Sequence, residues 1–267
     1  MIVSDARGVE LGDGAVTQVE QWGERGPVLL CVHGIASSRR SWRRTAEYFS
    51  ARYRVVAYDQ RGHGDSAAVA GPMTLERSLQ DLAAVAAAVD GPIRGLMGHS
   101  WGGAVAILGG RRIACERVIA VDPMVHQAPG MWAADFVDDL RDLFAIPADR
   151  RIPAIREMFA GSAAVEIEAK VHAMQSMRIE SVEALGAENG ADAGGWDVRE
   201  ALRDYPKPLF MPVADPSDSV ISPADLTFVR DHGGANVSVE VFAGEGHTLQ
   251  RTAFEKFAAA VERFLAG

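Results

Sequence analysis

Short apolar segments alternate with segments of helical periodicity along most of the chain. Compact apolar runs predict β-strands at 16–22, 28–32, 54–58, 93–97, 118–121, 209–213 and 237–242. Between them, apolar residues recur at intervals of three and four, most clearly in 75–89 and 254–264, which predicts amphipathic helices. This alternation is typical of an α/β protein with a mostly parallel central sheet flanked by helices.

One long region departs from the alternation. From about residue 124 to residue 205 the pattern predicts helices and no strand. A crossover between parallel strands needs only a dozen or so residues, and about eighty is far more than that. We therefore expect a core domain formed by residues 1–123 and 206–267, with residues 124–205 inserted as a helical cap subdomain.

Composition places the chain among ordinary globular proteins. Its 267 residues are enough for one domain with an insertion, and 48% of them are hydrophobic and 24% charged. The net charge of −9 argues against nucleic acid or an anionic membrane as the main partner. The basic residues Arg39, Arg40, Arg43 and Arg44 are expected on the solvated face of a helix.

The expected compartment follows from what the chain lacks. It has no stretch that looks like a signal peptide and no apolar run near the roughly 18 residues of a membrane span. Its two cysteines, Cys31 and Cys115, do not indicate a disulfide framework, and Cys and His never cluster at metal-ligand spacing. We expect a soluble, cytoplasmic protein that needs no metal and no cofactor; the oligomeric state is left open.

The strongest chemical signal is the sequence GHSWG at 98–102. It lies between the strand that ends at residue 97 and a helix of small residues, which is the setting of a nucleophile elbow. The sharp turn lifts the hydroxyl of Ser100 above the sheet, and side chains at Gly98 and Gly102 would collide with the neighbouring elements. Trp101 begins the helix, so its backbone N–H is available to stabilise an oxyanion. Ser100 is the predicted nucleophile.

With this motif and three further segments, the chain resembles the α/β-hydrolase superfamily, specifically its serine-nucleophile, cap-containing esterase-like members, over nearly its whole length. The sequence VHGI at 32–35 is similar to the family's His-Gly loop. That resemblance implies that Ile35 supplies the second oxyanion N–H and that His33 and Gly34 lie at the substrate site. The sequence DQRGHGDS at 59–66 resembles a loop that marks the fold and takes no part in catalysis.

The family resemblance also suggests the base and the acid. His247, in the sequence GEGH at 244–247, lies where the family places its catalytic histidine. The family commonly places the acid two residues before a Val or Ile pair, which favours Asp218, in the expected chain order Ser, Asp, His. Asp215 is expected to cap the turn that begins at Pro216, but it stays an alternative because a glycine common near residue 213 is missing here. Asp122, at the end of the preceding strand, is the other alternative.

A serine in this position favours acyl chemistry over the alkyl displacement of dehalogenases and epoxide hydrolases, which carry an aspartate there. We expect a carboxylic-ester hydrolase that forms an acyl-enzyme, with water as the second substrate. Alternatives are a carbon–carbon bond hydrolase, a lactonase, a peptidase or a perhydrolase. Two further alternatives of another class are a cofactor-free dioxygenase and a ligand receptor without turnover.

Apolar residues of the inserted region suggest the character of the substrate. If they gather over the active-site mouth, the substrate is a mainly apolar small molecule of moderate size. The candidates for this pocket are Met124, Met131, Trp132, Phe136, Phe144, Phe159 and Met177, of which Met124, Trp132 and Phe136 are the first choices.

Overall fold

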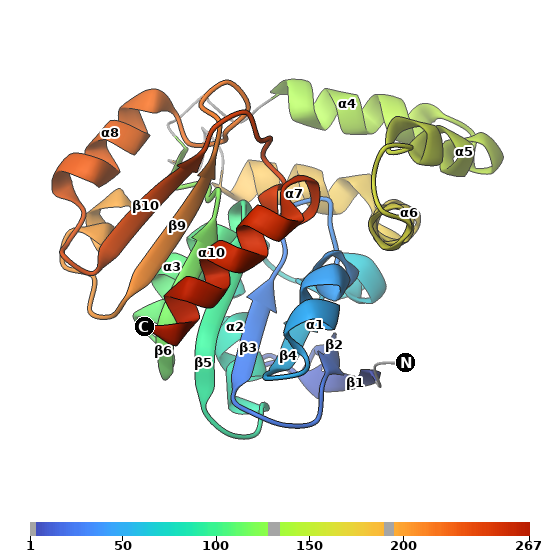
Figure 1. Ribbon diagram of the computed structural model, residues 1–267. Helices are drawn as coiled ribbons and strands as arrows, with labels where there is room; N and C mark the ends of the chain where they lie inside the picture. The colour runs from blue at the N-terminus through green and yellow to red at the C-terminus, as the bar shows by residue number, and fades with distance from the viewer. Residues whose placement is uncertain (1–3, 128–133, 190–194) are drawn as a thin grey trace.

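The computed structural model describes residues 4–127, 134–189 and 195–267. Its centre is an eight-stranded sheet with the strand order β1-β2-β4-β3-β5-β6-β9-β10 (Figure 1). β1 pairs antiparallel with β2, and β2 with β4, whereas the other neighbours are parallel. The mostly parallel sheet is therefore confirmed. The strands are β1 Ser4–Glu10, β2 Val16–Trp22, β3 Val28–Val32, β4 Arg54–Tyr58, β5 Ile93–His99, β6 Cys115–Val121, β9 Leu209–Ala214 and β10 Val237–Phe242.

The central strands are mostly apolar because helices cover both faces of the sheet. All five residues of β3 are buried, as expected for a central parallel strand between two layers of helices. The first strand, β1, was missed in the sequence because it has a single buried apolar residue, Val9, among polar neighbours. It pairs with β2 at the end of the sheet, where little burial is needed.

Helices form a layer on each face of the sheet (Figure 1). α1 (Arg43–Phe49) and α10 (Phe254–Ala266) pack into one apolar cluster with the strands. α2 (Leu75–Ala87), α3 (Trp101–Gly110) and α8 (Pro223–His232) contribute to the cluster on the opposite face. The helices predicted from residues 75–89 and 254–264 are both present.

Between β6 and β9 the described residues form four α-helices, which lie above the sheet in Figure 1. They are α4 (Ala134–Ala145), α5 (Ala148–Met158), α6 (Ala164–Ser176) and α7 (Ile179–Asn189). The expectation that this region has no strand is wrong, because β7 (His126–Gln127) and β8 (Trp196–Asp197) form a short antiparallel ladder. A 3₁₀ helix, η4 (Arg199–Leu202), leads back toward β9. The division into core and cap at residues 123/124 and 205/206 stays a prediction.

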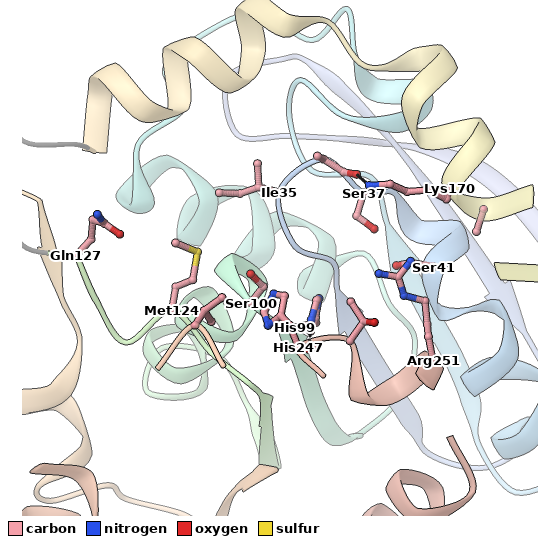
Figure 2. Close-up of a pocket in the computed structure, with 14 residues that line it drawn as sticks. Ile35, Ser37, Ser41, His99, Ser100, Met124, Gln127, Lys170, His247 and Arg251 are labelled. Carbon is pink, nitrogen blue, oxygen red and sulfur yellow. Dashed lines mark hydrogen bonds between the residues drawn. The ribbon is translucent and has the colours of Figure 1, made fainter. Parts of the chain in front are cut away.

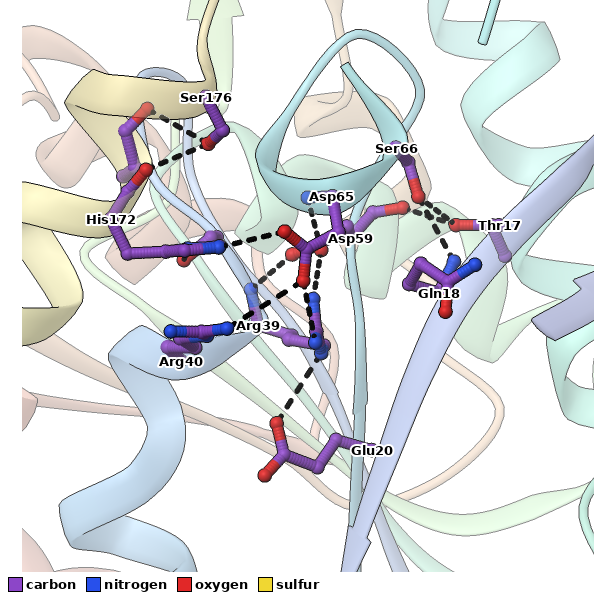
Figure 3. Close-up of polar contacts among 12 residues, drawn as sticks. Thr17, Gln18, Glu20, Arg39, Arg40, Asp59, Asp65, Ser66, His172 and Ser176 are labelled. Atoms are coloured by element: carbon purple, nitrogen blue, oxygen red, sulfur yellow. Dashed lines mark hydrogen bonds and ion pairs between the residues drawn. The ribbon is translucent and has the colours of Figure 1, made fainter. Parts of the chain in front are cut away.

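The basic run 39–44 is only partly the solvated face that the sequence predicted. Arg39, in the 3₁₀ helix η1 (Arg39–Trp42), is only 4% exposed and forms ion pairs with Asp59, Asp65 and Glu20 (Figure 3). Asp59 is fully buried after β4, and it also accepts the backbone N–H groups of Arg39 (2.7 Å) and Asp65 (2.8 Å). A buried carboxylate needs a buried counter-charge, which explains the position of Arg39. Arg40 and Arg43 are exposed, as predicted.

The loop that contains Asp59 joins the sheet to α6. Asp65, in the 3₁₀ helix η2 (Gly64–Ser66), accepts from His172 Nε2 of α6 at 2.9 Å (Figure 3). On the other side, Thr17 of β2 contacts Ser66 through their hydroxyls at 2.9 Å. These contacts connect the loop at 59–66 to β2 on one side and to α6 on the other.

No helix of the described residues combines the length and the apolar character that crossing a membrane requires.

Candidate active site

Ser100 occupies a strained turn between β5 and α3. Its backbone has φ 57° and ψ −121°, a conformation that non-glycine residues rarely adopt and that proteins retain mainly at functional sites. A Cβ at Gly98 would lie 1.9 Å from the carbonyl oxygen of Gly102, and one at Gly102 would lie 2.4 Å from that of His33. Both glycines are therefore required by close backbone approach, as the motif predicted, and the turn brings Ser100 to the carboxyl end of the sheet.

His247 and Asp122 form a short side-chain hydrogen bond at the same end of the sheet. His247 Nδ1 lies 2.6 Å from Asp122 Oδ2. Asp122 directly follows β6, is fully buried, and has the unusual φ of 37°. Its carboxylate also accepts the N–H of Ala214 (3.0 Å), the hydroxyl of Ser219 (2.6 Å) and the N–H of Val220 (3.1 Å). Including His247, four hydrogen-bond partners thus surround the carboxylate of Asp122 and fix it beside the imidazole.

Asp218, which the sequence favoured as the acid, does not contact the imidazole. Its exposed carboxylate accepts the backbone N–H of His247 at 3.2 Å. The chain after β9 turns toward solvent at 215–218, whereas Ser219 and Val220 fold back over Asp122. The alternative that the sequence analysis had kept second, Asp122, therefore takes the expected position of Asp218. Asp215 caps its turn as predicted, accepting the N–H and the hydroxyl of Ser217.

A second histidine, His99, contacts His247. The sequence did not predict this contact, because His99 lies within the GHSWG motif and carries no separate signal. Its Nε2 lies 3.0 Å from the backbone carbonyl oxygen of His247, and the two rings are 4.5 Å apart. The ring is 8% exposed, and burial, followed by the nearby His247, lowers the pKa of His99 well below its ordinary value. A neutral His99 leaves His247 free to take a proton without repulsion from a second charge.

The two predicted oxyanion donors come from separate segments of the chain. Trp101 is the first residue of α3, so its backbone N–H has no partner within the helix. Ile35 follows β3, lines the same cavity as Ser100, and precedes Ala36, whose φ is 55°. A Cβ at Gly34 would lie 3.0 Å from the Cβ of Ser100, so the loop passes close to the serine.

A cavity of about 310 Å³ opens above Ser100 (Figure 2). Met124 lines it, as predicted, but His33 does not. The imidazole of His33 is fully buried behind the loop, where its Nε2 accepts the N–H of Gln60 at 3.0 Å, and burial lowers its pKa to about 3. Gly34 shapes the loop beside Ser100 without lining the cavity. The lining residues are Ile35, Ala36, Ser37, Ser41, His99, Ser100, Met124, Gln127, Ala169, Lys170, Val220, His247, Thr248 and Arg251.

Three of the apolar residues predicted for the pocket lie elsewhere. Phe144, Phe159 and Met177 pack in an apolar cluster among helices α4 to α7, which also includes Ile35 and Ala36. Met131, Trp132 and the side chain of Phe136 lie outside the described residues. The polar lining was not predicted: Lys170 and Arg251 come from helical segments that carry no recognisable motif.

Within the described parts of the chain, no three His, Cys, Asp or Glu side chains converge in a way that would hold a metal ion.

A serine on a strand–helix turn, with a histidine–aspartate pair at the same end of a mostly parallel sheet, is the arrangement of α/β hydrolases. Comparison with known families agrees: residues 29–260 match the model of the alpha/beta hydrolase family. The chain belongs to this family.

Similarity to individual proteins is more distant. The chain is 32% identical over 123 residues to the magnesium-chelatase 30 kDa subunit of Rhodobacter capsulatus, covering 46% of this chain and 43% of that protein. It is 27% identical over 257 residues to the dihydrolipoyllysine-residue acetyltransferase component of the acetoin cleaving system of Pseudomonas putida, covering 92% of this chain and 65% of that one. The chain thus spans less than two thirds of the length of either relative.

Solved structures share the fold over the whole chain. A deformylase from Pseudomonas putida S16 superposes with a TM-score of 0.77 at 20% identity, covering 97% of this chain and all of that one. The esterase RhEst1 from Rhodococcus sp. ECU1013 superposes with a TM-score of 0.75 at 21% identity, covering 98% of each chain. At such identities the likeness establishes the fold and leaves the substrate open.

Proposed function

We propose that the protein is a serine hydrolase that cleaves a carboxylic ester through an acyl-enzyme on Ser100. The observation that carries this proposal is the 2.6 Å contact between His247 Nδ1 and the buried carboxylate of Asp122, at a cavity that Ser100 and His247 both line. Asp122 holds the Nδ1 proton, which leaves Nε2 of His247 as the basic nitrogen. The acid of this proposal is Asp122 and not Asp218.

The proposed reaction has two halves. In the first, His247 Nε2 takes the hydroxyl proton of Ser100 while Oγ forms a bond to the ester carbonyl carbon. The backbone N–H groups of Ile35 and Trp101 stabilise the oxyanion, a contribution typically worth about 10² to 10³ in rate for each donor. The C–O bond then breaks, and the alcohol leaves with the proton from His247.

In the second half, water replaces the alcohol. His247 takes a proton from the water, whose oxygen attacks the acyl carbon; the Ser100–acyl bond breaks, and Oγ regains the proton. The products are a carboxylic acid and an alcohol. Serine at the elbow favours this acyl chemistry because its hydroxyl, deprotonated by the histidine, attacks a carbonyl carbon, so the carbonyl that water later attacks comes from the substrate.

The test is a rate comparison on p-nitrophenyl esters of increasing acyl length, with the native protein and Ser100→Ala in parallel. We expect turnover by the native protein and its loss in the variant, with the best acyl length reporting the size of the cavity. Failure of the folded native protein to hydrolyse any of these esters would overturn the proposal. Turnover that persists in Ser100→Ala would shift the chemistry to one that uses only the histidine–aspartate pair.

A further inference from the structure

The cavity above Ser100 has two unlike ends. Met124 and Gln127 lie on one side of Ser100 in Figure 2, whereas Ser37, Ser41, Lys170 and Arg251 lie on the other. Lys170 comes from α6, and Arg251 from the short helix α9 (Leu249–Thr252) before α10. We call the four residues Ser37, Ser41, Lys170 and Arg251 the cationic end.

Neither cation of the cationic end has an acidic partner within the described part of the chain. The described cavity lining includes no Asp or Glu. Arg251 Nε is buried and has no hydrogen-bond partner there, and Lys170 Nζ donates to the carbonyl oxygen of Ala36 at 3.2 Å. Glu166 is close enough to Arg251 for its charge to act on the guanidinium. Its Oε1 already accepts a hydrogen bond from Arg44 Nη1 at 2.9 Å.

This arrangement of two buried cations is electrostatically unfavourable. Burial lowers the pKa of Lys170 to about 8, and the positive charge of Arg251 adds to this effect. Burial likewise lowers the pKa of Arg251. In a chain with a net charge of −9, two adjacent cations without a carboxylate are unusual, and a bound anion would relieve their repulsion.

We propose that the cationic end binds a carboxylate of the substrate, so that the esters this enzyme cleaves carry a free carboxylate beyond the scissile bond. This inference rests on the proposed function of Ser100. A carboxylate offers two acceptor oxygens, one for the guanidinium and one for the ammonium, and the hydroxyls of Ser37 and Ser41 can donate beside them. The mainly apolar substrate expected from the sequence is thereby replaced by one with an apolar part and a charged end.

A purely structural role for Lys170 makes a different prediction. Its bond to Ala36 holds the loop that carries Ile35, so its loss could disturb the oxyanion site. Such a disturbance lowers the rate for every ester alike. Loss of a carboxylate-binding group instead lowers the rate selectively for esters that carry the charge.

The experiment compares two esters of equal acyl length at pH 7: mono-p-nitrophenyl glutarate, which has a terminal carboxylate, and p-nitrophenyl pentanoate, which does not. We expect the native enzyme to prefer the glutarate ester in kcat/KM. In Lys170→Met and Arg251→Met, the ratio of the two kcat/KM values should fall about tenfold or more, as for loss of a hydrogen bond to a charged group. Lys170→Arg should retain most of the preference, and the matched control Lys256→Met, an exposed lysine of α10, should leave the ratio unchanged.

Two results overturn the proposal: a native enzyme with no preference for the charged ester, or variants in which both esters lose rate by the same factor. If the folded native enzyme hydrolyses neither ester, the proposed function has failed and calorimetry with glutarate tests the cationic end separately. Binding of glutarate that weakens about tenfold in Lys170→Met supports the site. Absence of binding, or equal binding by the native protein and the variant, overturns it.

Discussion

Asp122→Asn tests which carboxylate orients the base. In the native protein, Oδ2 of Asp122 faces two donors, His247 Nδ1 at 2.6 Å and the N–H of Val220 at 3.1 Å, while Oδ1 accepts from Ala214 and Ser219. An asparagine has the same shape but only one acceptor oxygen. The NH₂ group of the asparagine would donate where one carboxylate oxygen accepted. If this NH₂ group faces His247, Nδ1 must accept from it and the imidazole proton moves to Nε2.

A proton on Nε2 removes the basic nitrogen that Ser100 needs. Loss of the correct tautomer in a serine triad lowers kcat by about 10⁴, and we expect a fall of that order here. The donor of Val220, left without its acceptor, destabilises the fold by about 1–3 kcal/mol. Release of p-nitrophenolate from p-nitrophenyl esters measures kcat. Urea unfolding checks that Asp122→Asn is still mostly folded under the assay conditions.

Asp218→Asn is the matched control. The carboxylate of Asp218 is exposed, and its contact is with the backbone N–H of His247 at 3.2 Å, which the amide oxygen of asparagine can still accept. We expect kcat to change by less than about tenfold, since a single exposed hydrogen bond is worth roughly 1 kcal/mol. A loss near 10⁴ in Asp218→Asn together with a mild effect in Asp122→Asn would refute the assignment.

Three further changes probe the elbow, the buried ion pair and the cationic end. Gly98→Ala places a Cβ 1.9 Å from the Gly102 carbonyl oxygen. We therefore expect the free energy of unfolding, measured with urea, to fall by about 1–3 kcal/mol and most of the activity to be lost. A variant with native stability and a native rate would contradict this packing. Arg39→Met leaves the buried carboxylate of Asp59 without its counter-charge, and we expect urea unfolding to show a loss of about 3–5 kcal/mol. The exposed control Arg40→Met should change stability by less than about 1 kcal/mol, and equal effects would count against the buried pair. Because the pKa of Lys170 is lowered to about 8, its ammonium is present below that pH and lost above it. The guanidinium of Arg251 stays charged over this range, and the other charged groups nearby, Arg44 and Glu166, form an ion pair with each other. KM for the glutarate ester should rise between pH 7 and pH 9 in the native enzyme but stay flat in Lys170→Arg, and parallel profiles would contradict this reasoning.

Local signals in the sequence were sufficient for every strand of the large sheet except β1 and for the turn on which Ser100 lies. A buried parallel strand must be apolar along its length, so β3 and its neighbours stand out, and close backbone approach at the elbow demands Gly98 and Gly102. The polar strand β1 has almost no buried face, and periodicity therefore does not reveal it.

The partner of His247 and the residues that line the cavity depend on tertiary contacts that no local pattern encodes. Asp122 and Asp218 both follow strands that end at the same edge, and only the path of 215–220 decides which of them reaches His247. Arg39 lies in a basic run of the kind usually found on surfaces, but it is buried because Asp59, which follows β4, requires a counter-charge. Lys170 and Arg251 lie 81 positions apart, and folding alone brings them to one cavity.

Labelling by a fluorophosphonate, which reacts with activated serines, tests the nucleophile most directly. Intact mass spectrometry of the native protein should show one adduct, peptide mapping should locate it on Ser100, and ester hydrolysis should disappear in step with labelling. Ser100→Ala, equally folded, should take up no label and hydrolyse no ester. A native protein that hydrolyses esters with Ser100 unlabelled, or a labelled residue elsewhere whose modification stops turnover, would contradict catalysis by Ser100.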